Sequence, residues 1–235
     1  MSFDELTALV QRGDLRQARG DALGALRDYE LALKEAPEDP MIWNNRGVSL
    51  SSLGRYDEAA GSYRKAIDIR PGYWMAWYNL GKALHLKADR TPDVAEGYEA
   101  ALDAYERALE LNPSHTSTLN NKAVALRRLG RHEAALEAYD ELLGFDPLYG
   151  HAWYNKGLLL KLLGFPDEAA ECFEAASGLN PELAGSARRE AGPGRPAGRG
   201  HRPPRPPAGP PGGDGPGETD LRDVERPRPK RTKKR

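Results

Sequence analysis

The sequence predicts an all-α solenoid, an array of stacked helical hairpins, followed by a disordered C-terminal tail. Two observations lead to this prediction. A pattern of aromatic, glycine, alanine and proline residues recurs with a period of 34 residues through the first 184 positions. Periods of that length are typical of stacked supersecondary units. The composition changes near Gly185, and no aromatic residue occurs in the 51 positions from there to the end of the chain.

The repeat is clearest when residues 41–71 are compared with residues 151–181. Trp43, Gly47 and Gly54 of the first segment correspond to Trp and Gly residues at the same offsets in the second. Prolines at the ends of the units follow one another with gaps of 34, 42, 34 and 34 residues: Pro37, Pro71, Pro113, Pro147 and Pro181. The chain therefore contains five units, of which the third is longer than the others.

Each unit contains two amphipathic patterns, which we expect to form the two helices of a hairpin. In the second pattern of the second unit, Ala59, Tyr63 and Ala66 share one helical face, and Pro71 ends the helix because proline lacks the N–H group. Glycines predict the turns inside four of the hairpins: Gly20, Gly54, Gly130 and Gly164. One hairpin cannot bury its apolar face alone, so the units must stack.

This pattern of Trp, Gly, Ala, aromatic and Pro residues resembles the tetratricopeptide repeat. The resemblance implies a right-handed superhelix of helix-turn-helix hairpins, in which the first helix of each repeat lines the concave face. It covers five repeats, at 6–39, 40–73, 74–115, 116–149 and 150–183. The first repeat is degenerate, because Leu9 replaces the tryptophan and Arg16 stands at a position that is usually apolar.

The third repeat has 42 residues, eight more than its neighbours, and the excess lies between Leu84 and Ala101. Thr91, Pro92 and Asp93 form a strong helix start, with an N-cap, a proline in the first turn and an acidic residue. We expect the insertion to lengthen the second helix at its N-terminus and to project ~9–12 Å beyond the neighbouring hairpins. It is either a neutral surface extension or a contact surface.

The sequence contains no constellation of catalytic residues, no phosphate-binding glycine loop and no metal-binding cluster. Cys172 is the single cysteine, which excludes a disulfide framework and predicts a structural thiol. The sequence shows neither a signal peptide nor an apolar run long enough to span a membrane. We therefore predict a cytoplasmic, non-enzymatic protein without a cofactor, which acts as a scaffold or adaptor for a partner protein.

An asparagine recurs two positions after the tryptophan position in four repeats. Helical geometry places this residue away from the face that packs on the neighbouring repeat. An asparagine amide is both a donor and an acceptor, so a ladder of such residues is suited to pairing with the backbone of an extended peptide. The alternative is that these amides bond within the superhelix. The predicted ladder consists of Asn45, Asn79, Asn121 and Asn155.

Further residues of the first helices make the predicted groove basic and aromatic in its C-terminal half. This character favours an acidic extended segment as the ligand. A two-carboxylate clamp for chaperone C-termini needs basic residues and asparagines at fixed positions on three successive first helices. In each possible register of this sequence, only the central asparagine is present. The sequence therefore argues against a chaperone tail as the partner. The remaining predicted groove residues are Tyr78, Lys82, Arg127, Arg128, Tyr154 and Lys161.

The tail from residue 185 to 235 differs from the body in charge. It has 14 Lys or Arg and six Asp or Glu residues, whereas the whole chain has a net charge of −1. Because the tail has almost no apolar side chains, it is predicted to be disordered. Residues 226–235 hold seven basic residues, so nucleic-acid association through the tail is the alternative function. Since 182–190 has few apolar residues, we also expect the last repeat to be poorly capped.

Overall fold

The computed structural model describes residues 2–90 and 94–191, and within these ranges it contains eleven helices and no strand. The helices are α1 (Phe3–Ala18), α2 (Ala22–Glu35), α3 (Pro40–Ser52), α4 (Tyr56–Ile69), α5 (Trp74–Ala88), α6 (Val94–Leu111), α7 (Thr116–Arg128), α8 (His132–Phe145), α9 (Gly150–Leu162), α10 (Pro166–Leu179) and α11 (Pro181–Ala191). Consecutive helices pack against one another along the whole array. The predicted all-α solenoid is confirmed.

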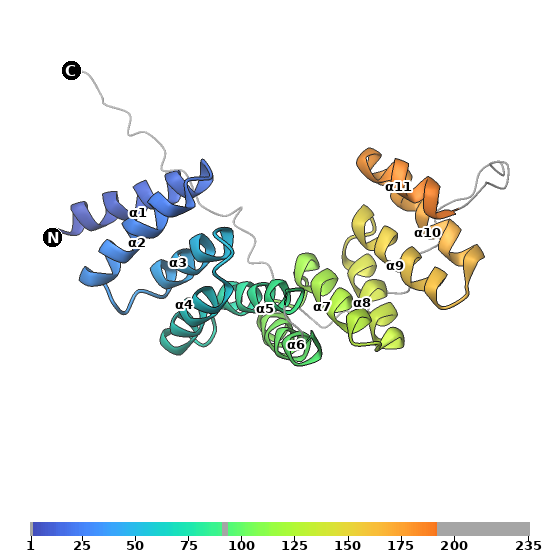
Figure 1. Cartoon of the computed structure of the whole chain (residues 1–235), viewed down its shortest axis with the longest axis horizontal. Coiled ribbons are helices and arrows are strands. Elements are labelled where there is room, and N and C mark those ends of the chain that lie inside the picture. The colour runs from blue at the N-terminus through green and yellow to red at the C-terminus, as the bar shows by residue number, and fades with distance from the viewer. Residues whose placement is uncertain (1, 91–93, 192–235) are drawn as a thin grey trace, which may run out of the picture.

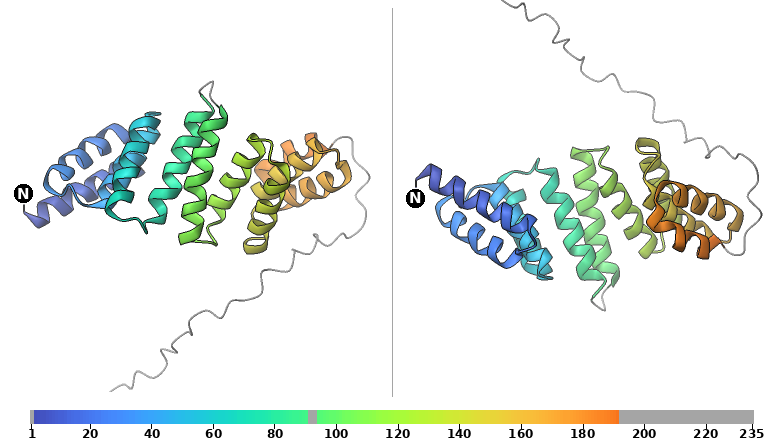
Figure 2. Two further views of the ribbon diagram at one scale, coloured as in Figure 1. Left: turned by 90° about the horizontal axis from the view of Figure 1, so that it is seen from below. Right: turned by 90° about the horizontal axis from the view of Figure 1, so that it is seen from above.

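The array is curved like an open arc, with both ends on the same side (Figure 1). The helices α1, α3, α5, α7 and α9, which are the first helices of the five hairpins, lie on the inner side of the arc. The even-numbered helices lie on the outer side, and two further views show the hairpins stacked side by side in chain order (Figure 2). We call the part of the inner side formed by α3, α5, α7 and α9 the concave surface. Helix α1 also lies on the inner side and, unlike these four helices, carries acidic residues.

The hairpin turns are made by glycines that adopt positive φ angles. Gly20, Gly54, Gly130 and Gly164 have φ between 73° and 85°, a conformation that glycine reaches without the steric penalty of a side chain. These are the four glycines that the sequence predicts as turns. The connection of the third hairpin includes residues 91–93, which lie outside the described residues.

A second set of glycines allows the two helices of a hairpin to approach closely. A Cβ atom on Gly81 would lie 2.6 Å from the ring of Tyr105, and one on Gly47 would lie 2.6 Å from the ring of Tyr63. Both tyrosine rings are almost fully buried. The aromatic ring of the second helix therefore fills the space that the glycine of the first helix leaves open.

Tryptophans connect each hairpin to the loop before it. The indole Nε1 atoms of Trp43, Trp77 and Trp153 donate hydrogen bonds of 2.7–2.9 Å to the carbonyl oxygens of Pro37, Pro71 and Pro147. Each proline lies six residues earlier, in the loop that follows the preceding hairpin. Leu119 takes the tryptophan position of the fourth hairpin, and its side chain has no N–H group to donate.

The insertion of the third repeat lengthens the second helix of its hairpin, as predicted, and it also lengthens the first helix, which was not predicted. Helix α5 has 15 residues and α6 has 18, whereas α3 has 13 and α4 has 14. Four extra residues in α6 correspond to ~6 Å, less than expected, because part of the insertion went into α5. The predicted helix start at residues 91–93 lies outside the described residues.

The tip of this hairpin contacts the hairpins on both sides. Toward the second hairpin, Lys87 pairs with Asp57. Toward the fourth, the Glu99 carboxylate accepts a hydrogen bond of 2.5 Å from Arg131. The α5–α6 hairpin is therefore tied by ion pairs to the hairpin on each side.

Helix α11 corrects the expectation that the last repeat is poorly capped. The helix continues to Ala191, beyond the predicted boundary at Gly185, and packs against α10 and α9. Ala187 is buried in a cluster with Ala169 and Phe173. Such a helix needs few apolar residues, because a small alanine is what fits against the large phenylalanine ring. The predicted tail beyond Ala191 lies outside the described residues.

The degenerate first hairpin has an ionic cluster beside its apolar core. The Asp28 carboxylate, whose side chain is only 2% exposed, lies 2.7 Å from Arg12 and 3.0 Å from Arg16. This contact explains why an arginine stands at the usually apolar position 16.

Candidate functional site

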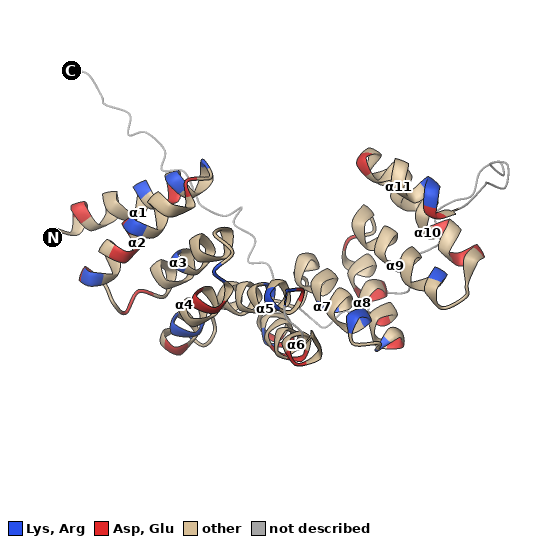
Figure 3. Ribbon diagram, in the orientation of Figure 1, with Lys and Arg blue, Asp and Glu red and all other residues tan. Residues whose placement is uncertain are grey.

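The concave surface is made by the first helices of four consecutive hairpins, and these helices contain no acidic residue. Helices α3, α5, α7 and α9 carry Lys and Arg but neither Asp nor Glu, whereas each of the outer helices α4, α6, α8 and α10 carries several acidic residues. Figure 3 shows this separation of charge along the array. The body of the protein is acidic, yet its acidic residues lie mainly on the outer side.

Three of the inner cations are paired with an outer acid of the preceding hairpin. In each pair the two residues are 16 positions apart: Arg46 with Glu30, Lys122 with Glu106, and Lys156 with Asp140. Sequence analysis did not single out these pairs, although their constant spacing was a usable signal. They join neighbouring hairpins and leave fewer cations free for a ligand.

The four asparagines of the predicted ladder connect the inner helices to one another. The Nδ2 atom of Asn79 donates to Oδ1 of Asn44 at 2.9 Å, and that of Asn155 donates to Oδ1 of Asn120 at 3.2 Å. Both acceptors belong to the preceding hairpin. The amides therefore bond within the superhelix, which was the alternative interpretation of the ladder.

The other two asparagines follow the same arrangement with different partners. Asn45 donates to the Asp14 carboxylate at 3.0 Å, and Asn121 hydrogen-bonds the Tyr78 hydroxyl. Burial raises the pKa of Tyr78, and the bond from Asn121 lowers it. One N–H group of an amide is used in each such contact, and a primary amide carries two, so the ladder keeps capacity for a ligand.

The two predicted tyrosines are half-buried between the helices. The ring of Tyr78 lies 5.0 Å from the ring of His115, in an edge-on arrangement. Tyr154 packs against Phe173 of the last hairpin, with ring centroids 5.7 Å apart. Both tyrosines therefore contribute to packing as well as to the inner side of the array.

The four predicted cations have different surroundings. Lys82 is exposed and has no hydrogen bond or ion pair within the described part of the chain. Arg128 lies 3.7 Å from Asp89, and Lys161 is bound by α11, with its Nζ 2.8 Å from the Glu190 carboxylate. Arg127 is half-buried beside Tyr139. The cap helix thus neutralises Lys161, which weakens the predicted basic character at the C-terminal end.

His85 lies at the centre of a polar cluster on α5. Its Nε2 atom is 4.0 Å from Asp89, its ring meets Tyr98 edge-on at 5.0 Å, and its Nδ1 atom is buried without a hydrogen-bond partner among the described residues. Tyr98 donates a hydrogen bond to Asp89. Burial lowers the pKa of His85, Asp89 raises it, and Arg128 lowers it.

We expect His85 to make the array less stable in acid. Its pKa is lower in the folded chain than in the unfolded chain, so the unfolded chain binds more protons and stability falls as the pH drops below about 6.5. Thermal unfolding of the wild type and of His85→Gln, measured between pH 7.5 and 5, checks this. The variant should lose less of its Tm on acidification, and His151→Gln, at an exposed histidine, should behave like the wild type.

The described residues do not suggest another chemistry. They hold no group of three or more His, Cys, Asp and Glu side chains placed to bind a metal ion. The Cys172 thiol is buried, and burial raises its pKa to about 11, so it is a poor nucleophile at neutral pH. Among the helices from α1 to α11, none is long and apolar enough to span a bilayer.

Comparison with known proteins agrees with the geometry. Family profiles described as tetratricopeptide repeat match residues 3–73, 94–152 and 150–183. The crystal structure of MamA protein superposes with a TM-score of 0.64 at 27% sequence identity, covering 77% of this chain and 94% of that one.

Two relatives are similar in sequence over about half of the chain. The Photosystem I assembly protein Ycf3 of Acaryochloris marina is 31% identical over 127 residues, covering 50% of this chain and 76% of Ycf3. The heat-shock protein cognate co-chaperone sgt12 of Aspergillus fumigatus is 32% identical over 106 residues. That match covers 45% of this chain but 29% of the co-chaperone. The repeats, the helical hairpins and these matches establish that the chain belongs to the tetratricopeptide repeat family.

Proposed function

We propose that this protein is a non-enzymatic interaction scaffold that binds an extended, acidic peptide segment along its concave surface. Tetratricopeptide repeat proteins are protein-interaction scaffolds, and the peptide-binding mode is the specific part of the proposal. The observation that carries it is the absence of acidic residues from the four helices α3, α5, α7 and α9. Helices without carboxylates do not repel a negatively charged segment, and Lys82 and Arg127, which have no acidic partner in the described structure, attract it.

The asparagine ladder supports an extended ligand. Its amides recur once per hairpin on the inner helices and are only half-buried. With one N–H group engaged between hairpins, the remaining amide groups face the peptide backbone in this proposal. Backbone pairing supplies affinity that does not depend on the ligand's side chains, and the inner cations then select for acidic sequences.

Lys82 gives the cleanest test, because the asparagines also hold the hairpins together. We expect Lys82→Glu to weaken binding of a short fluorescein-labelled glutamate-rich peptide by about fivefold at low salt, since an exposed charge contributes up to about 1 kcal/mol. Fluorescence anisotropy measures the affinity. Lys65→Glu is the matched control, because Lys65 is an exposed lysine of α4 on the outer side.

Two results would contradict the proposal. One is equal affinity for the glutamate-rich peptide and for a lysine-rich peptide of the same length. The other is an equal loss of affinity in Lys82→Glu and Lys65→Glu, since that would show general attraction rather than binding at the concave surface. A chaperone tail is not the ligand in this proposal, because the clamp positions hold Val10, Met75 and other unsuitable residues.

Nucleic-acid association is a second candidate function, favoured by the seven basic residues within 226–235. It is separable from peptide binding by a chain that ends at Ala191, which retains α11 intact. If the tail binds nucleic acid, this shortened chain loses binding to single-stranded RNA and keeps binding to the glutamate-rich peptide. Retained RNA binding would contradict a role of the tail.

A further inference from the structure

Arg127 is a half-buried cation without an acidic partner in the described structure. This distinguishes it from the other partly buried Lys and Arg side chains among residues 2–90 and 94–191, each of which pairs with a carboxylate. Those paired residues are Arg16, Arg46, Lys87, Lys122 and Lys156. Because removing a charge from water is costly unless an opposite charge compensates it, the exception calls for an explanation.

The surroundings of Arg127 leave its guanidinium incompletely bonded. Its Nε atom is buried and has no hydrogen-bond partner among the described residues. The guanidinium lies beside the hydroxyl of Tyr139 on α8, and it lowers the pKa of that phenol, which burial raises to about 12. A neutral phenol does not balance the charge of the arginine, so the charge remains available to a ligand.

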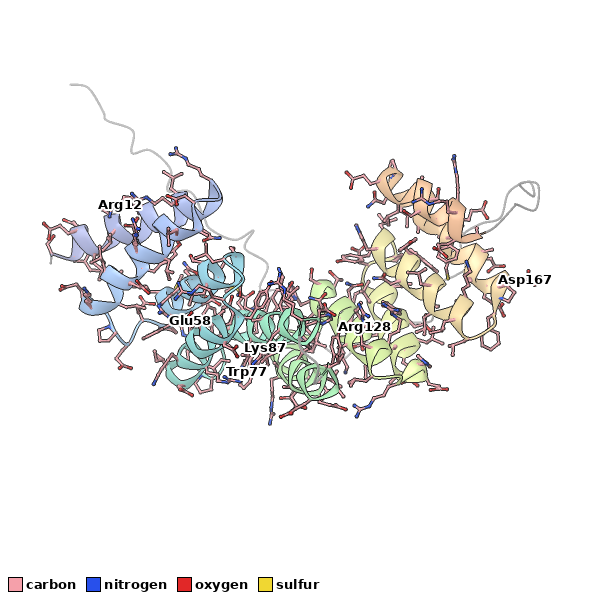
Figure 4. The ribbon with its side chains drawn as sticks, viewed as in Figure 1. Arg12, Glu58, Trp77, Lys87, Arg128 and Asp167 are labelled. Atoms are coloured by element: carbon pink, nitrogen blue, oxygen red, sulfur yellow. The ribbon has the colours of Figure 1, made fainter. Side chains whose placement is uncertain are left out.

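The position at the end of a helix does not account for the burial. Arg127 and Arg128 are both in the last turn of α7, where cations interact favourably with the helix dipole. Arg128, labelled in Figure 4, does so with a side chain that is 51% exposed. A helix-end cation therefore has no need to be buried, and the placement of Arg127 against Tyr139 is a separate feature.

The neighbouring groups make this end of α7 positive. Asp89 is the nearby carboxylate, and it is already engaged by the Tyr98 hydroxyl and by Arg128. The 3.7 Å separation between Arg128 and Asp89 is too long for a direct hydrogen bond, so Arg128 also has donors to spare. Two arginines with free N–H groups thus follow one another in the last turn of a helix that has no acidic residue.

We propose that Arg127, assisted by Arg128, is the anchor of an oxyanion site that takes a carboxylate or phosphate group. A guanidinium offers parallel N–H groups that bind such a group in a bidentate manner, and the half-buried setting strengthens the interaction. The inference rests on the proposed function in one respect, namely that a bound peptide carries the anion. Arg127 does not occupy any position of the two-carboxylate clamp that binds chaperone C-termini.

Free ions test the site independently of any peptide. The full-length chain is titrated with inorganic phosphate and, separately, with acetate, and the Nε–H signals of the arginines are followed by NMR at constant ionic strength. We expect the Arg127 signal to shift saturably. In Arg127→Met the protein should bind the same ion about tenfold more weakly, the effect of losing a charged hydrogen bond.

Arg131 provides the matched control, because it lies four residues later, at the N-cap of α8, and its charge is satisfied by Glu99. Arg131→Met should bind the ion as the wild type does. Saturation by phosphate, by acetate or by both supports the site and identifies the group it takes. A linear drift with both ions, or equal affinity in the wild type and Arg127→Met, overturns the inference even if peptide binding at Lys82 is observed.

Stability without added anion distinguishes a ligand site from a structural role. If Arg127 is kept for a ligand, Arg127→Met relieves an uncompensated charge and raises the Tm by about 2 °C in a buffer free of oxyanions. Arg131→Met, which breaks a satisfied pair, should not raise it. A lower Tm for Arg127→Met than for the wild type in the absence of oxyanions would show that the arginine serves the fold and would overturn the inference.

Discussion

Replacing Gly81 by alanine is expected to destabilise the array by about 2–3 kcal/mol, because the new methyl group has no space. Its Cβ atom would lie 2.6 Å from the ring of Tyr105 and 3.1 Å from the carbonyl oxygen of Ala101. The tyrosine ring is fully buried and has nowhere to move, so the two helices of the third hairpin must separate. Urea unfolding followed by circular dichroism measures the loss.

Gly61 supplies the control for this experiment. It is also a glycine within a helix, but a Cβ atom there would meet nothing within 4 Å. Gly61→Ala should therefore stabilise the protein by up to about 1 kcal/mol, the difference in helix propensity between the two residues. If both substitutions change stability in the same direction, close helix approach at Gly81 is not what holds the hairpin together.

Removing α11 is expected to have the second large effect. A chain that ends at Asn180 exposes the face of α10 that contains Ala169 and Phe173 and loses the contact between Lys161 and Glu190. Phe173 stays packed on Tyr154 and Gly157, so removing α11 uncovers only part of its ring. This exposure costs about 1–2 kcal/mol, and the Tm should fall by about 3–6 °C relative to a chain that ends at Ala191.

Hydrogen exchange locates the effect of the shortened chain. Amide protons of α9 and α10 should exchange faster in the chain that ends at Asn180, whereas those of α3 and α4 should be unchanged. Uniform protection in both chains would mean that α11 does not cap the array. Full-length protein and the chain ending at Ala191 should behave alike in this measurement, since both retain the cap helix.

The hairpins were predictable because their signals are local and repeated. Gly54, Ala59 and Tyr63 each have one structural task, and the same task recurs at the same offset in the other repeats. The position of the insertion and the longer second helix were predictable, whereas the longer first helix was not. Residues between Leu84 and Ala101 are compatible with extending either helix, and the close contact of Ala88 with Gly97 decides that both are extended.

The side-chain hydrogen bonds of the concave surface were harder to predict from the sequence. An asparagine amide serves a neighbouring hairpin or a ligand equally well, and the superhelical packing decides that Asn79 reaches Asn44. The cap helix was missed because its one buried residue, Ala187, carries no distinctive pattern. The missed cap helix also affects Lys161. This lysine was expected to face a ligand, but it binds Glu190 of α11.

The extended α5–α6 hairpin bears on how the array comes apart. In a linear repeat protein, opening begins at the ends and passes from unit to unit wherever the coupling between neighbours is weakest. Lys87 and Glu99 add coupling on both flanks of the longest hairpin, toward Asp57 and Arg131. Partial unfolding should therefore stop at this hairpin from either direction. The segment from α3 to α8 then acts as a cooperative core, with the terminal hairpins exchanging independently around it.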